Sequence, residues 1–181
     1  VDRLRQWIQW EERVVAVGEV GLDYHWPEPA WDVQQAVFID MVKLAVELDV
    51  PIIIHDREAH GDTLDILRQY GKGIRGVFHC YSGSLEMTDE LLRMGFYFGF
   101  DGPLTYPNSK RAKRVASHLP LDRMLIETDC PYLTPQAHRG QRNEPAYVHY
   151  VAEEIAALRG IDAAEVARAT TENAKRLFAI P

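Results

Sequence analysis

The sequence contains little cysteine, no long apolar run and no excess of positive charge. Its two cysteines, Cys80 and Cys130, are too few for a disulfide framework and suit a cytoplasmic protein. No apolar stretch approaches the ~20 residues of a membrane-spanning helix, and no signal peptide opens the chain. Because 27 acidic side chains outnumber 20 basic ones, nucleic acid can be bound only through local basic patches. We therefore expect a cytoplasmic protein with no membrane partner and no obligate protein partner.

The composition is that of a chain with a real core. Hydrophobic residues make up 46% of the 181 residues and charged residues 26%, which excludes disordered, collagenous and low-complexity classes. This length is typical of one domain, so residues 1–181 are expected to fold as a single unit.

Short β-rich runs alternate with longer amphipathic segments along the chain. Helical periodicity follows each of the first four runs, and a long polar segment, 129–144, follows the fifth. A helix begins at Pro145, and two more are expected, a short one capped by Asp162 and a last one over 171–178. The expected strands are 14–20, 51–55, 76–81, 96–100 and 123–128.

Apolar strands joined by helices predict a parallel sheet that is covered on both faces. No glycine-rich nucleotide loop follows the first strand, so a doubly wound nucleotide-binding sheet lacks its usual signature. The pattern favours a (β/α)8 TIM-type barrel. Five strands cannot close one, and the helical spacing of Leu4, Trp7 and Ile8 indicates that the sequence begins inside an element.

Polar residues with metal-binding side chains stand near the ends of four expected strands. They are Glu19, His55, His79 and Asp129. In a barrel of this type the carboxyl ends of the strands meet, so these side chains are expected to converge. Each alone is compatible with a structural role, but buried carboxylates beside neutral imidazoles require a compensating cation. A donor set without thiolate suits Zn, Mn, Mg or Fe.

The polar segment after the fifth strand contains two arginines, Arg139 and Arg142, separated by two residues. Guanidinium groups at the mouth of a barrel suit an anionic substrate, although either arginine could equally brace the loop through ion pairs. A basic run at 110–114 opens the preceding helix, and such a run is usually a solvated face that could also steer a polyanion.

The cysteines and the remaining histidines carry no catalytic pattern. Cys80 alternates with His79 and is expected to point toward the helices, and Cys130 has no histidine nearby in sequence before His138. Four histidines without a matching motif are treated as surface residues: His25, His60, His118 and His149.

Five segments together resemble the TatD family of metal-dependent deoxyribonucleases, in the amidohydrolase superfamily. They read GEVGLDY, PIIIHDREA, VFHCYSG, ETDCPYLTPQAHRGQRNEP and ATTENAKRLF, and they span essentially the whole chain. The resemblance implies a (β/α)8 barrel, one or two divalent metal ions (Mg, Mn or Zn) and DNA as the substrate. The implied reaction is hydrolysis of phosphodiester bonds by metal-activated water, typically by an exonuclease.

The resemblance also implies roles for single residues. Glu19 corresponds to a ligand that can bridge two metals, and His55 and His79 correspond to imidazole ligands. Asp129 corresponds to a ligand that also acts as the general base. Three arginines are implied to bind substrate or order loops: Arg57, Arg139 and Arg142.

One motif of the family is missing from these residues. Family members begin with a strand that carries an HxH pair of ligands, and no HxH occurs in this sequence. A barrel needs about 250 residues, so the five strands are expected to be strands four to eight, and 1–181 the C-terminal two thirds. Two alternatives remain open: an amidohydrolase acting on an amide, lactone or small ester, and an inactive truncated scaffold.

Overall fold

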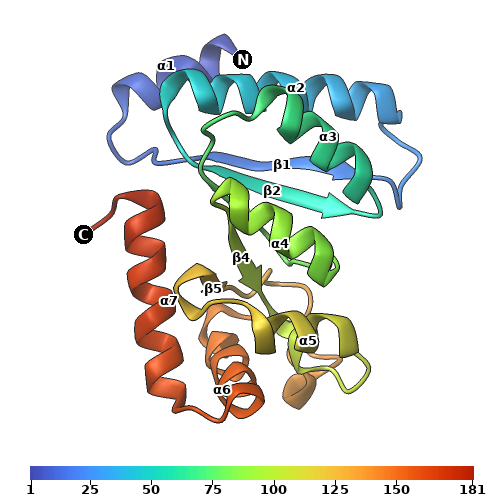
Figure 1. Ribbon diagram of the computed structural model, residues 1–181, viewed down its shortest axis with the longest axis vertical. Coiled ribbons are helices and arrows are strands. Elements are labelled where there is room, and N and C mark those ends of the chain that lie inside the picture. Colours follow the sequence, from blue (N-terminus) through green and yellow to red (C-terminus); the bar gives the residue numbers. More distant parts are fainter.

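The computed structural model describes residues 1–181, and its framework is one five-stranded parallel sheet in the order β1-β2-β3-β4-β5. The strands are β1 (Val17–Asp23), β2 (Ile52–Arg57), β3 (Gly76–Phe78), β4 (Tyr97–Phe100) and β5 (Met124–Ile126). The α-helices are α1 (Asp2–Trp10), α2 (Trp31–Leu48), α3 (His60–Tyr70), α4 (Leu85–Met94), α5 (Lys110–His118), α6 (Val148–Arg159) and α7 (Ala163–Phe178). The strand direction turns between β2 and β4, so the sheet is an open, curved array with helices packed along it (Figure 1).

The two faces of the sheet bury different sets of side chains. Adjacent residues of a strand point to opposite faces, and Phe78 and Phe98 enter the larger core while Val77 and Tyr97 enter a second, smaller cluster. Helix α7 contributes Leu177 to the smaller cluster. Both faces are therefore covered, as is required for a sheet made only of parallel strands.

Strand β1 begins and ends three residues later than expected, at Val17 and Asp23. The cause is its close pairing with β2, where Gly21 lies opposite His55. A Cβ atom at Gly21 would lie 1.8 Å from the carbonyl oxygen of His55, so only glycine allows this approach. As a result β1 continues to Asp23, and Glu19 lies within the strand rather than at its end.

The C-terminal segment forms one helix, α7, where two were expected. Its beginning is as predicted, because the Asp162 carboxylate accepts a hydrogen bond of 2.7 Å from the Ala164 amide. Buried Asn173 then fixes the helix to the sheet by donating to the carbonyl oxygens of Leu121 and Met124, both at 2.8 Å. The helix continues through the expected break, from Ala163 to Phe178. None of the helices combines the length and the apolar character that crossing a membrane requires.

Candidate metal centre

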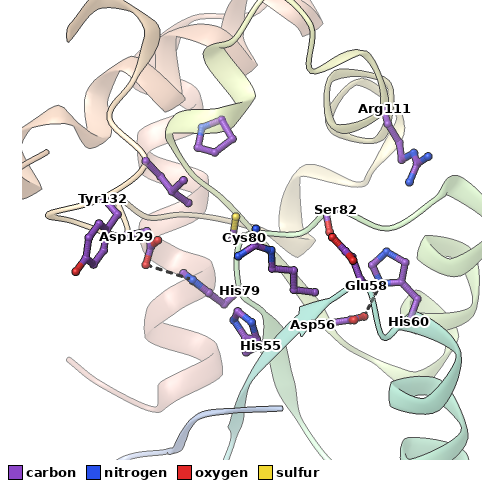
Figure 2. A pocket seen from close by; sticks show the side chains of 13 residues that line it. His55, Asp56, Glu58, His60, His79, Cys80, Ser82, Arg111, Asp129 and Tyr132 are labelled. Atoms are coloured by element: carbon purple, nitrogen blue, oxygen red, sulfur yellow. Dashed lines mark hydrogen bonds and ion pairs between the residues drawn. The ribbon is translucent and has the colours of Figure 1, made fainter. Parts of the chain in front are cut away.

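A cavity of about 630 Å³ opens at the carboxyl ends of β2, β3 and β5, where polar side chains of the three strands converge (Figure 2). His55 comes from β2, while His79 directly follows β3 and Asp129 lies three residues after β5. Glu19 reaches the same place from β1, on the side of His55 and His79. The fold thus brings together the four residues that the sequence singles out.

His79 faces two carboxylates with one ring nitrogen. Its Nε2 atom lies 3.5 Å from Oδ1 of Asp129 and 3.8 Å from Oε1 of Glu19. Ligands of one metal ion, each about 2.1 Å from it, stand roughly 3.0–3.4 Å from one another. Both distances from His79 Nε2 are therefore slightly longer than the spacing of two ligands of one ion, and small side-chain movements would shorten them.

The other ring nitrogen of His79 is held by a carboxylate that the sequence alone did not single out. Nδ1 lies 2.9 Å from Oε2 of Glu127, and Oε1 of Glu127 accepts a hydrogen bond of 2.6 Å from the Cys80 amide. Gly99 makes room for this carboxylate, because a Cβ atom there would lie 2.4 Å from Oε1 of Glu127. Such a carboxylate fixes the ring and leaves Nε2 free for a metal.

His55 has a similar arrangement with its two nitrogens exchanged. Nε2 lies 3.0 Å from Oδ2 of Asp23, and Nδ1 lies 2.9 Å from Oε1 of Glu19. Asp23 is the acid at the end of β1, so the extension of that strand supplies the partner of His55. Both imidazoles are thus oriented by one carboxylate and turn their other nitrogen toward Glu19.

Burial and these pairs shift the pKa values of the side chains in the cluster. The hydrogen bond to His55 lowers the pKa of Glu19, and the same bond raises the pKa of His55. Burial alone would lower the pKa of His79, but the Glu127 carboxylate and its acidic neighbours raise it to about 9. Burial raises the pKa of Asp129. In the absence of a cation, protons on the imidazoles balance part of the acidic charge.

The donor set fits a divalent cation. Oxygen and imidazole nitrogen are the ligands of Zn, Mn and Mg sites, and no thiolate takes part. Nearby Asp101 is 3% exposed, its Oδ2 atom has no hydrogen-bond partner, and burial raises its pKa to about 7. No three His, Cys, Asp or Glu side chains are arranged as the ligands of one metal ion. His55 and His79 form ion pairs with Glu19 and Glu127 instead. A cation would replace the protons in those pairs.

The loop after β5 holds Asp129 at the cavity. Asp129 has a backbone φ of 52°, in the left-handed region. Buried Asn143 supports this conformation by donating hydrogen bonds of 2.6 Å to the carbonyl oxygens of Thr128 and Tyr132, on either side of Asp129. The long polar segment is therefore ordered by its own amide side chain.

The three arginines of the sequence analysis lie in different surroundings. Arg57 lines the cavity. Arg139 lies over the ring of Tyr106, with its guanidinium carbon 4.3 Å from the ring centroid, and Arg142 is exposed on the same loop. Neither Arg139 nor Arg142 lines the cavity of Figure 2.

Two expectations about single residues were wrong. Cys80 lines the cavity instead of pointing toward the helices, because β3 ends at Phe78 and Cys80 has a φ of 45°, so strand alternation no longer applies. Burial raises the pKa of its thiol. His60 is not a free surface residue: it lines the same cavity, and its Nδ1 atom lies 2.7 Å from Oδ2 of Asp56.

Comparison with known proteins identifies the family. The model of the family described as "TatD related DNase" matches residues 1–179. The chain belongs to this family. A relative from Bacillus subtilis, YabD, is 52% identical over 170 residues, covering 93% of this chain and 67% of the relative. Escherichia coli YcfH is 45% identical over 181 residues, covering 99% of this chain and 68% of the relative. Both carry the description "Uncharacterized metal-dependent hydrolase".

The crystal structure of the TatD homologue YjjV from Escherichia coli confirms the fold. It superposes with a TM-score of 0.90 at 33% identity, covering 99% of this chain and 70% of that chain. The five parallel strands are thus part of a TatD (β/α)8 barrel, as the sequence predicts. Membership of the TatD family identifies the chain as part of a metal-dependent hydrolase.

Proposed function

We propose that the protein hydrolyses phosphodiester bonds of DNA with one or two divalent ions (Mg, Mn or Zn). It acts as an exonuclease, which removes nucleotides from an end of the strand. The observation that carries the proposal is the convergence of two carboxylates on one imidazole nitrogen at the cavity: Glu19 Oε1 lies 3.8 Å and Asp129 Oδ1 3.5 Å from His79 Nε2. When bound there, a divalent ion supplies a water of lowered pKa and neutralises charge on the phosphate.

The side chains have separate roles in this proposal. Glu19, His55, His79 and Asp129 hold the cation. Glu127 and Asp23 keep the two imidazole rings oriented from their outer nitrogens. Asp129, one-third exposed at the cavity, accepts a proton from the attacking water as general base.

The cavity also has groups suited to an anionic substrate. Arg57 lines it and makes no ion pair within the chain, so its guanidinium is available to a phosphate oxygen. Arg139, held over Tyr106, orders the loop in this proposal, and Arg142 at its exposed position contacts the DNA strand outside the cavity. DNA is accordingly the proposed partner.

We also place the protein in the cytoplasm. Its two cysteines, Cys80 and Cys130, form no disulfide, and neither thiol is needed as a metal ligand. Glutathione and thioredoxin keep thiols reduced in that compartment.

The test is cleavage of end-labelled single-stranded and double-stranded DNA by the full-length protein in excess Mg²⁺ or Mn²⁺. Amides, lactones and small esters are assayed in parallel, because the same ligands can activate water against a carbonyl. Stepwise shortening of DNA that stops in EDTA supports the proposal. Turnover of amides or lactones without DNA cleavage identifies an amidohydrolase, and no turnover of any substrate by metal-loaded protein identifies a scaffold.

A further inference from the structure

The candidate metal ligands occupy one side of the cavity, and the opposite side carries polar groups that the chemistry above does not use. His60 stands at the beginning of α3, Ser82 follows β3, and Arg111 lies in the first turn of α5. Figure 2 shows these side chains on the wall away from His79 and Asp129.

His60 is held in place by a buried acid. Its Nδ1 atom lies 2.7 Å from Oδ2 of Asp56, a side chain that is only 4% exposed. The other oxygen of Asp56, Oδ1, is buried without a hydrogen-bond partner. A buried carboxylate with no second partner favours the charged imidazolium, and this bond raises the pKa of His60. The His60 side chain is 34% exposed, so the remaining N–H of its ring, at Nε2, can donate a hydrogen bond to a ligand in the cavity.

Arg111 adds a second positive charge to the same wall. It makes no ion pair or side-chain hydrogen bond within the chain, and its charge acts on His60 to lower the pKa of the imidazole. Two cations facing one cavity repel each other, and an anion between them relieves this repulsion.

Two acids on this wall oppose these charges: Asp56, which pairs with His60, and Glu58. Glu58 also lines the cavity, and its Oε1 atom lies 3.1 Å from Nδ1 of His25. Its side chain is 63% exposed, so its charge is screened more strongly than that of buried Asp56. This wall of the cavity therefore presents two positively charged hydrogen-bond donors, His60 and Arg111. The Ser82 hydroxyl adds a neutral donor.

We propose that His60 and Arg111, assisted by Ser82, bind a second phosphate group of the substrate, next to the phosphate that is cleaved. Imidazolium and guanidinium groups form charge-assisted hydrogen bonds with phosphate oxygens. The subsite rests on the proposed function, because it requires a substrate with more than one phosphate. A second cavity of about 390 Å³ shares Ser82 and Arg111 with the first and gives the strand a path beyond the subsite.

The kinetic test compares two substrates of the full-length, metal-loaded protein. One is the single-stranded pentanucleotide of thymidine, and the other is bis(p-nitrophenyl) phosphate, which has a single phosphate. Arg111→Gln and His60→Gln should each lower kcat/KM for the pentanucleotide about 10-fold relative to the single-phosphate substrate, mainly through KM. Arg114→Gln removes the same charge from the same helix at an exposed position outside the cavity, and should leave the ratio unchanged.

Binding provides a readout that does not depend on hydrolysis. In EDTA, the affinity of a fluorescein-labelled pentanucleotide is measured by anisotropy against salt concentration. Arg111→Gln should reduce the slope of log affinity against log salt by about 0.7, and Arg114→Gln should not. Arg111 is exposed, so this variant is informative even where His60→Gln disturbs folding around Asp56.

The outcomes separate the two proposals. If the wild type binds the pentanucleotide but hydrolyses neither substrate, the nuclease proposal fails, and a reduced salt slope in Arg111→Gln still supports the subsite. If the wild type cleaves DNA but Arg111→Gln and His60→Gln behave like Arg114→Gln in both assays, the subsite is refuted and the nuclease proposal stands.

Discussion

The Nδ1 atom of His79 lies 2.9 Å from Oε2 of Glu127, on the side of the ring away from Asp129 and Glu19. This contact fixes which nitrogen of His79 faces the cavity. It also links the strand end of β5 to that of β3, so a side chain outside the ligand set determines the geometry within it.

Glu127→Gln should therefore weaken metal binding without unfolding the protein. A neutral amide holds the ring less firmly and makes its other nitrogen a weaker ligand, and loss of such a partner typically costs 10–100-fold in affinity. Calorimetric titration with Mn²⁺ measures the effect. Glu153→Gln, at an exposed position on α6, is the control. Equal affinities in both variants would mean that Glu127 has no orienting role.

Asp129→Asn should abolish hydrolysis while retaining part of the metal affinity. The amide cannot accept the proton of the attacking water, and a positioned general base contributes about 10²–10⁴-fold to the rate. The measurement is the single-turnover rate of DNA cleavage at saturating Mn²⁺, with bound metal quantified in the same samples. An undiminished rate in this variant would show that another group acts as the base.

Without metal, the thermal stability should fall as the pH rises from about 6.5 to 9. The pKa of His79 is raised from its ordinary value of 6.5 to about 9 in the folded chain, so the stabilising charge pair with Glu127 is complete below pH 6.5. It is lost as the pH rises through the folded pKa. Melting in EDTA should show a decrease of several degrees, since each 1 kcal/mol shifts the melting temperature by about 2–4 °C at this size.

Mn²⁺ should reverse this trend over the same pH range. Metal binding requires the unprotonated imidazole, so metal affinity and metal-dependent stabilisation rise as the proton leaves. Melting curves with and without Mn²⁺ should therefore diverge with increasing pH. Parallel curves would contradict the assignment of His79 as a ligand.

Gly99→Ala should impair the site by displacing Glu127. The added methyl group would lie 2.4 Å from Oε1 of Glu127, so this carboxylate must move and release His79 and the Cys80 amide. We expect Mn²⁺ affinity to fall about 10-fold, as for other losses of an outer carboxylate. Gly61→Ala is the matched control, because nothing lies within 4 Å of its methyl group and α3 should gain up to about 1 kcal/mol.

The sequence predicted the elements that depend on local pattern. The five parallel strands, the Asp162 cap of α7 and the convergence of Glu19, His55, His79 and Asp129 all follow from apolar periodicity and from polar residues near strand ends. The convergence could be predicted because in a (β/α)8 barrel successive strands are neighbours and their carboxyl ends meet at one face.

The remaining features depend on contacts between distant residues. Asp23 was missed as the partner of His55 because β1 continues past its apolar run, which the fit of Gly21 against β2 makes possible. His60 was assigned to the surface because its partner, Asp56, lies across the boundary between a strand and a helix. No periodicity spans such a boundary, although the Asp–His spacing of four residues is visible in the sequence.

The proposed activity requires a divalent ion at the cluster of His79, Glu19 and Asp129. The decisive measurement is DNA cleavage by EDTA-treated full-length protein during stepwise addition of Mn²⁺, with bound metal counted at each step, for the wild type and His79→Asn. We predict that wild-type cleavage rises in proportion to one or two bound ions and that His79→Asn loses both binding and cleavage. Cleavage that persists in EDTA, or full metal binding and activity in His79→Asn, would contradict the account.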